Sequence, residues 1–138
     1  MISHLHVLVV DDDSVITDLL GIHLERMGYS VTVAPSAIEG LKKVSEETYH
    51  LIVSDVEMPG MDGIEFLSRV RAEQPTIGIV IMTAFPENHP RTIAVRAGAD
   101  GYVGKPFNLK KFSNVLERAY WNALTRADDL DFEHEEAL

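Results

Sequence analysis

The strongest constraint on the fold is a regular alternation between short apolar runs and segments with helical periodicity. Each run is four to six residues long and is bounded by polar or turn-forming residues, as is typical of strands buried on both faces. The five runs are residues 5–10, 31–34, 51–54, 78–82 and 101–104. Apolar residues recur at helical spacing in residues 15–27, 37–44, 64–71 and 109–124, and Pro90 and Gly98 suit the start and the end of a further helix over residues 90–97. Five strands alternating with five helices predict an α/β fold with a mostly parallel sheet covered on both faces.

Polar side chains follow four of these five runs. They are Asp11, Asp12 and Asp13 after the first run, Asp55 after the third, Thr83 after the fourth and Lys105 after the fifth. Because the carboxyl ends of parallel strands meet at one edge of a sheet, we expect these side chains to converge there. Asp13 is also suited to cap the helix that follows it. We therefore predict a functional role for Asp11 and Asp12 and a capping role for Asp13.

Residues 51–63 hold the most informative of these strand ends. The apolar run ends on a lone carboxylate, Asp55, and Pro59, Gly60 and Gly63 then break the strand. Taken alone, this stretch fits an aspartate that caps a loop as well as it fits a phosphorylation site. The other polar strand ends favour the phosphorylation site.

The predicted cluster has a coherent chemistry. Crowded carboxylates repel one another and need a cation when they are ionised. Oxygen ligands without Cys or His favour Mg²⁺, which binds through one or two carboxylates and keeps several waters. Lys105 adds a mobile positive charge and Thr83 a hydroxyl donor. With these partners, Asp55 is suited to be the nucleophile of aspartyl-phosphate chemistry.

Composition narrows the class of protein. The length of 138 residues predicts about one domain. A net charge of −10 argues against general affinity for nucleic acid or anionic lipid. The lack of cysteine excludes disulfides and thiolate metal sites, and a reducing cytoplasm is the expected location. No signal peptide and no apolar run near the roughly 20 residues of a membrane span is found. Residues 128–138 hold six acids and no base, which predicts a solvated tail or the start of a linker.

Four short motifs, in this order, resemble the receiver domain of two-component response regulators. They are VVDDD at residues 9–13, DVEMPGMDG at 55–63, MTA at 82–84 and GYVGKPF at 101–107. The resemblance covers residues 4–125 and implies a flavodoxin-like, doubly wound (βα)5 fold with strand order 2-1-3-4-5. Residues 126–138 would then be an acidic C-terminal tail or the start of a linker.

The resemblance also implies a role for each site residue. Asp55 would accept a phosphoryl group from the phosphohistidine of a histidine kinase. Mg²⁺ would be held by Asp12, Asp55 and the backbone carbonyl of Glu57, with Asp11 acting mainly through a bound water. Thr83 and Lys105 would hold the phosphoryl oxygens. Tyr102 would be an aromatic switch that turns inward once Thr83 moves, since a phosphoaspartate adds charge and acceptor oxygens that draw in the hydroxyl.

The function implied is a signalling switch and not a turnover enzyme. Its input partner would be a histidine kinase or a histidine phosphotransfer protein. Its output would be a downstream protein or an output domain that reads the surface of the fourth helix, fifth strand and fifth helix. The last helix also offers a face for a phosphorylation-dependent homodimer. We expect no direct binding of this chain to nucleic acid or membrane.

Two features depart from the family pattern. Pro86 and Pro90 stand where the fourth helix usually begins, so we expect that helix to be short or to begin late. Glu57 and Phe85 occupy the positions two past Asp55 and two past Thr83, where the family tunes phosphoryl lifetime.

Two other functions compete with the switch. The first is a Mg²⁺-dependent phosphohydrolase of the haloacid dehalogenase type, because residues 11–15 match its Asp-x-Asp-x-Val pattern with Asp11 as nucleophile. The chain leaves no room for a cap domain, and this reading does not explain the motif at Asp55. The second is a degenerate receiver that acts only as an interaction module, although such chains usually lose part of the site that is kept here.

Overall fold

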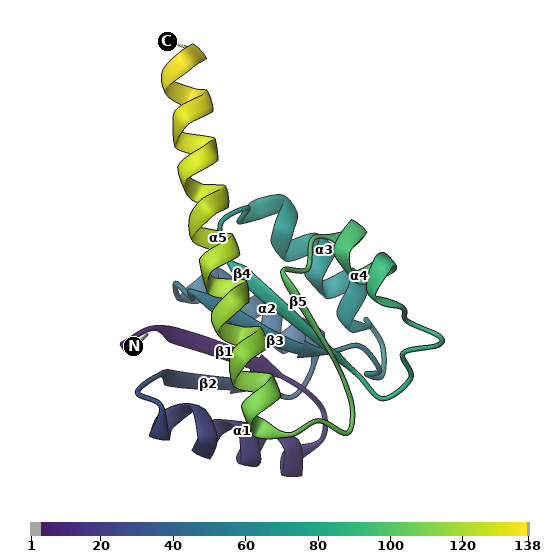
Figure 1. Ribbon diagram of the computed structural model, residues 1–138. Helices are drawn as coiled ribbons and strands as arrows, with labels where there is room; N and C mark the ends of the chain where they lie inside the picture. The colour runs from purple at the N-terminus through teal and green to yellow at the C-terminus, as the bar shows by residue number, and fades with distance from the viewer. Residues whose placement is uncertain (1–3, 138) are drawn as a thin grey trace.

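The computed structural model describes residues 4–137, with side chains for residues 4–127. Its core is a five-stranded parallel sheet in the order β2-β1-β3-β4-β5, which confirms the predicted flavodoxin-like topology (Figure 1). The strands are β1 (His6–Val10), β2 (Ser30–Ala34), β3 (Leu51–Asp55), β4 (Gly78–Thr83) and β5 (Gly101–Gly104). Two strands are one residue longer at their carboxyl ends than the apolar runs, so that β3 ends on Asp55 and β4 on Thr83.

Five helices cover the two faces of this sheet (Figure 1). They are α1 (Ser14–Arg26), α2 (Ala37–Glu46), α3 (Gly63–Glu73), α4 (Arg91–Ala97) and α5 (Leu109–Ala137). Alternate residues of each strand point to opposite faces, and two hydrophobic cores result. Leu8 and Val10 of β1 pack into the core under α2, α3 and α4, whereas Val7 and Val9 pack into the core under α1 and α5.

Side-chain caps begin four of the helices near the carboxyl edge of the sheet, and for α5 the cap is Asn108, which accepts from the backbone N–H of Lys111. Asp13 accepts a hydrogen bond from the backbone N–H of Val15, as predicted. Ser36 and Asp62 cap α2 and α3 in the same way. A cap satisfies one of the unpaired N–H groups of a helix end. The caps therefore help to fix where each strand-to-helix loop ends.

Helix α4 is seven residues long and begins at Arg91, directly after Pro90. The expectation of a short or late fourth helix is confirmed. Pro90 can start a helix because its ring fixes φ, but it offers no side-chain cap. The segment from Phe85 to His89 is instead held by a turn, in which the N–H groups of Asn88 and His89 both donate to the carbonyl of Phe85.

Helix α5 continues to Ala137, well beyond Leu124, the last apolar position of the predicted pattern. Residues 126–137, predicted as an acidic tail or the start of a linker, extend this helix past the end of the sheet (Figure 1). The boundary predicted at residue 125 is not marked by a break in the backbone. Within residues 4–137, no helix is long and apolar enough to cross a membrane.

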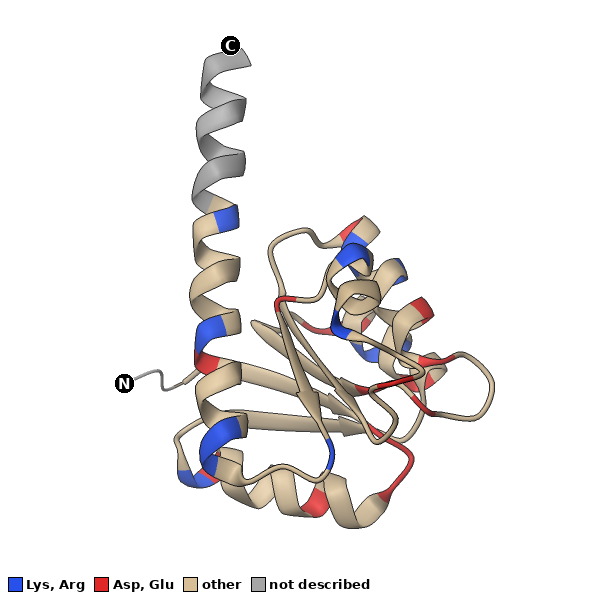
Figure 2. Cartoon of the chain, turned by 45° about the vertical axis from the view of Figure 1, so that its right-hand side comes forward, with Lys and Arg blue, Asp and Glu red and all other residues tan. Residues whose placement is uncertain are grey.

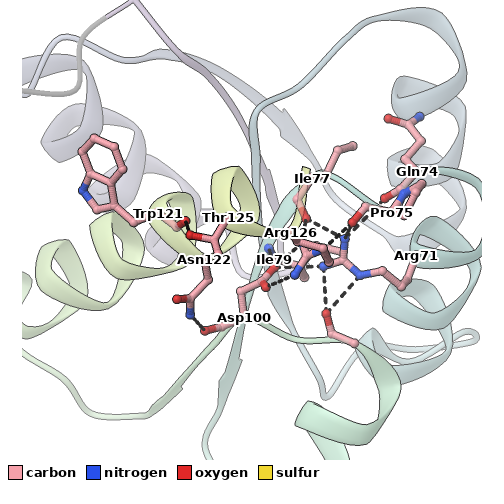
Figure 3. A network of polar contacts seen from close by, with 11 residues as sticks. Arg71, Gln74, Pro75, Ile77, Ile79, Asp100, Trp121, Asn122, Thr125 and Arg126 are labelled. Carbon is pink, nitrogen blue, oxygen red and sulfur yellow. Dashed lines mark hydrogen bonds and ion pairs between the residues drawn. The ribbon is translucent and has the colours of Figure 1, made fainter. Parts of the chain in front are cut away.

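An ionic network anchors α5 at the amino-terminal edge of the sheet (Figure 3). The Asp100 carboxylate, only 5% exposed, pairs with Arg126 of α5 and with Arg71 of α3. Arg126 also donates to the backbone carbonyls of Pro75 and Ile77. The network therefore joins α5 to α3 and to the loops before β4 and β5.

Candidate functional site

The predicted site residues lie at the carboxyl edge of the sheet. Asp11 directly follows β1, Asp55 ends β3, Thr83 ends β4 and Lys105 directly follows β5. β1 and β3 are neighbours in the sheet, which brings Asp11 next to Asp55 although 44 positions separate them in the chain. Acidic residues mark this edge, and a basic residue stands at the end of β5 (Figure 2).

The acidic cluster consists of Asp11, Asp12 and Asp55. One carboxylate oxygen from each lies within 4.8 Å of the other two. Asp11 and Asp55 are 2% and 5% exposed, and Asp12 is exposed to solvent. The Nζ of Lys105 lies 3.2 Å from Asp11 Oδ2 and 3.2 Å from Asp55 Oδ1. Of these two contacts, only the one with Asp11 has the geometry of a hydrogen bond, and the buried Oδ1 of Asp55 accepts none from the described residues.

Burial and mutual repulsion make these carboxylates harder to ionise. The pKa of Asp55 is raised to about 6, first by desolvation and then by the charge of Asp11, against the opposing effect of Lys105. Burial also raises the pKa of Asp11. Burial lowers the pKa of Lys105, but the nearby charges of Asp55 and Asp11 outweigh that effect and leave this pKa raised.

This arrangement fits a hard divalent cation. Three carboxylates face one ammonium group, so the ionised cluster has an excess of negative charge. Asp55 Oδ1 lies 3.2 Å from Lys105 Nζ but accepts no hydrogen bond from the described residues, so it offers a buried oxygen to a cation. Oxygen-only donors, one of them open to solvent, suit Mg²⁺ with several waters. The contribution of the Glu57 backbone carbonyl stays a prediction.

The structure places Thr83 and Tyr102 in a second group of contacts, around Glu57. The buried Thr83 hydroxyl donates to Glu57 Oε2 at 2.7 Å. The hydroxyl of the half-buried Tyr102 donates to the backbone carbonyl of His89 at 2.7 Å. His89 Nε2 in turn lies 3.6 Å from Glu57 Oε2.

Sequence reasoning missed the Glu57 side chain and His89. The sequence predicts a metal-binding backbone carbonyl for Glu57 and places the residue where the family tunes phosphoryl lifetime, but it predicts none of these side-chain contacts and no role for His89. The available signal was the position of Glu57 in the loop after β3, because β3 and β4 are adjacent and Glu57 can therefore face the end of β4.

Gly63 allows the loop after Asp55 to close. A Cβ atom at this position would overlap the backbone carbonyl of Asp55. The Gly63 N–H donates to the carbonyl of Val56, so the start of α3 lies directly against the end of β3. Only glycine permits this close approach.

Together, the sheet order and the acidic edge with its lysine define a class of protein: flavodoxin-like domains with a cluster of carboxylates at the carboxyl edge of the sheet. The family model described as the response regulator receiver domain matches residues 7–117. The chain belongs to this family.

Several known proteins are similar to the chain. The alkaline phosphatase synthesis transcriptional regulatory protein PhoP of Bacillus subtilis is 41% identical over 105 residues, covering 76% of this chain and 44% of PhoP. A CheY-like receiver domain from Methanospirillum hungatei superposes with a TM-score of 0.83 at 30% identity, covering 89% of this chain and 98% of that one. The Thermotoga maritima response regulator TrrA, solved in complex with Mg²⁺ and BeF, has a TM-score of 0.75 at 34% identity, covering 83% and 97% of the two chains. The chain spans about half the length of curated relatives such as PhoP.

Proposed function

We propose that the chain is a phosphorylation-activated signalling switch in which Asp55 accepts a phosphoryl group from the phosphohistidine of a histidine kinase or histidine phosphotransfer protein. The observation that carries this proposal is the state of Asp55 itself. Its carboxylate is buried at a strand end, beside two further acids and Lys105, and its Oδ1 has no hydrogen bond from the described residues.

In the proposed step, an Asp55 carboxylate oxygen attacks the phosphorus while the bond to the histidine nitrogen breaks. The histidine keeps the bonding electron pair and leaves as a neutral imidazole after taking up a proton. Lys105 stabilises the charge on the transferring oxygens, and the Thr83 hydroxyl donates to one of them afterwards. Asp11, Asp12, Asp55 and the Glu57 carbonyl would hold Mg²⁺, which supplies charge neutralisation when bound.

The output follows from the same residues. Movement of Thr83 toward the phosphoryl group would let Tyr102 turn inward and repack the α4–β5–α5 face. A downstream protein or an output domain would read this change, and a phosphorylation-dependent homodimer is one form the output can take. Residues 4–125 would form the switch, residues 126–138 an acidic tail or linker, and the protein would work in the cytoplasm. It would assist its own phosphorylation and dephosphorylation without being a turnover enzyme.

The phosphohydrolase alternative places the nucleophile on Asp11. Both oxygens of this side chain are engaged, one by the N–H of Asp13 and the other by Lys105. An oxygen that accepts a well-aligned hydrogen bond is a weaker nucleophile than one that accepts none, and Asp55 Oδ1 accepts none from the described residues although Lys105 Nζ lies 3.2 Å away. This difference favours Asp55.

Acetyl phosphate with Mg²⁺ tests the proposal. Mass spectrometry of the treated protein should locate the phosphoryl adduct on Asp55, and Asp55→Asn should abolish it. Asp13→Asn is the matched control, because asparagine also caps helices and the adduct should persist. An adduct on Asp11, or one that survives Asp55→Asn, would overturn the assignment.

A further inference from the structure

The Glu57 carboxylate accepts hydrogen bonds from two donors at and just after the end of β4, and one of them is the Thr83 hydroxyl that the proposed function assigns to the phosphoryl group. Its Oε2 accepts from the Thr83 hydroxyl at 2.7 Å, and its Oε1 accepts from the backbone N–H of Ala84 at 2.9 Å. Thr83 is fully buried, and its oxygen also accepts from the N–H of Phe85 at 3.0 Å, so the hydroxyl proton is committed to Glu57. The two groups that donate to Glu57 lie at and just after the end of β4, the strand that pairs with β3 beside Asp55.

We infer that Glu57 is an internal latch: its carboxylate competes with the phosphoryl group for Thr83 and Ala84 and holds the switch in its unphosphorylated conformation. This inference rests on the proposed function, because it concerns the same phosphoryl group. Two charge-assisted hydrogen bonds make the carboxylate a strong competitor. A phosphoaspartate brings about −1.5 to −2 charge near Glu57, so the two anions repel each other and the carboxylate must leave as Thr83 turns.

The latch extends to Tyr102. Glu57 Oε2 lies 3.6 Å from His89 Nε2, and the His89 carbonyl accepts the hydroxyl of Tyr102 at 2.7 Å. His89 belongs to the turn between β4 and α4, where its N–H donates to the carbonyl of Phe85. Departure of Glu57 therefore removes a contact from the turn that holds the Tyr102 hydroxyl. One carboxylate couples the phosphoryl donors to the aromatic side chain.

A purely structural role makes the opposite prediction. If Glu57 served only to satisfy the buried Thr83 hydroxyl, its removal would leave that group unpaired and loosen the site. Phosphoryl binding would then weaken or stay the same. If Glu57 is a latch, its removal frees two donors for the phosphoryl oxygens, and binding tightens.

The test measures the affinity of the full chain for beryllofluoride, a phosphoryl mimic, by calorimetry at saturating Mg²⁺. Glu57→Ala should bind at least ten-fold more tightly than the wild type, and Glu57→Gln should be intermediate because it loses the charge but keeps one acceptor. Both variants keep the backbone carbonyl. Glu65→Ala is the matched control: it removes an equal charge from an exposed position whose partner is Arg69, and should leave the affinity unchanged.

The outcomes separate the two proposals. Equal or weaker binding by both Glu57 variants, with a wild type that binds beryllofluoride, would overturn the latch and leave the proposed function standing. Equal tightening by Glu65→Ala would also overturn it, because the effect would then be one of net charge. A wild type that neither binds beryllofluoride nor forms an adduct on Asp55 would overturn both.

Discussion

Asp55 is buried beside a second buried carboxylate, Asp11, and the two share one lysine. Because burial and the neighbouring acid outweigh the lysine, ionising Asp55 costs free energy in the folded state. The pKa of Asp55 is raised from 3.8 to about 6, chiefly by burial. The folded protein then holds a proton on this group over a pH range in which the unfolded chain has lost it. The corresponding stabilisation is fully present below pH 3.8 and is lost as the pH rises through about 6.

We expect Asp55→Asn to reveal this cost in metal-free buffer. The stability of the variant relative to the wild type should increase by about 2 kcal/mol between pH 4 and pH 7, since each unit of pKa shift corresponds to about 1.4 kcal/mol. Chemical denaturation across this range measures the difference. Added Mg²⁺ should reduce it at pH 7, because a bound cation favours the ionised wild-type carboxylate. A difference that does not change with pH would contradict the prediction.

For single residues, the sequence predicts which side chains belong to the site better than it predicts their hydrogen bonds. Asp11, Asp55 and Lys105 could be predicted to meet because parallel strands end at one edge, whatever rotamers the side chains adopt. The hydrogen bonds of Glu57 could not, because a loop side chain two residues past Asp55 can face either the acids or the end of β4. Only the path of the loop decides between them.

Loop closure after β3 depends on the absence of a side chain at Gly63. We expect Gly63→Ala to destabilise the fold by about 2 kcal/mol, since the added methyl group would overlap the Asp55 carbonyl and force the start of α3 away from β3. The same variant should accept less phosphoryl from acetyl phosphate, because Asp55 would shift. Denaturant unfolding and adduct yield measure the two effects.

Gly21 provides the matched comparison. It lies within α1, and a Cβ atom there would meet nothing within 4 Å. Gly21→Ala should therefore raise stability by about 0.5–1 kcal/mol through helix propensity and leave the adduct yield unchanged. A neutral Gly63→Ala, or one no more harmful than Gly21→Ala, would show that the loop can open without cost.

The elements themselves were largely predictable, and the exceptions have physical causes. The prolines at 86 and 90 correctly indicated a late α4, because proline restricts where a helix can begin. The apolar pattern ends at Leu124 and the acids after it are typical of a solvated tail, so the sequence pattern does not predict the full length of α5. A usable signal was present: the chain has no glycine or proline after residue 106, and these are the two residues least favourable in a helix interior.

Across the whole molecule, one buried carboxylate adds an ionic anchor to the hydrophobic packing that holds α5 on the sheet. Asp100 holds Arg71 and Arg126 and also accepts from the backbone N–H of Ile79 (Figure 3). Sequence reasoning found the sheet but not this anchor, because residues 71, 100 and 126 are brought together only by the complete fold. Removing a buried acid that pairs with two guanidinium groups lowers the stability of the fold far more than removing an exposed ion pair does.

We expect Asp100→Ala to cost about 3–5 kcal/mol, since it leaves two partly buried guanidinium groups without their anion. Arg126→Ala should cost about 1–2 kcal/mol and should raise hydrogen exchange mainly in the second half of α5. Arg118→Ala is the control: it lies on the same helix, is exposed and has no hydrogen bond or ion pair with the residues described here, so it should change stability by less than about 0.5 kcal/mol. Uniform loss of protection across the sheet in Arg126→Ala would contradict a local anchor.

The order of the strands also determines when, during synthesis, the site residues can come together. Within this sheet, Asp11 follows the strand that is synthesised first and Lys105 follows the strand that is synthesised last, and Asp11 meets Asp55 only once β1 has paired with β3. A chain that ends before β5, or in which β5 has not yet paired, would hold Asp55 without Lys105 beside it. Under the proposed function, the chain would accept a phosphoryl group efficiently only once the sheet is complete. Incompletely folded copies would therefore not respond to the kinase.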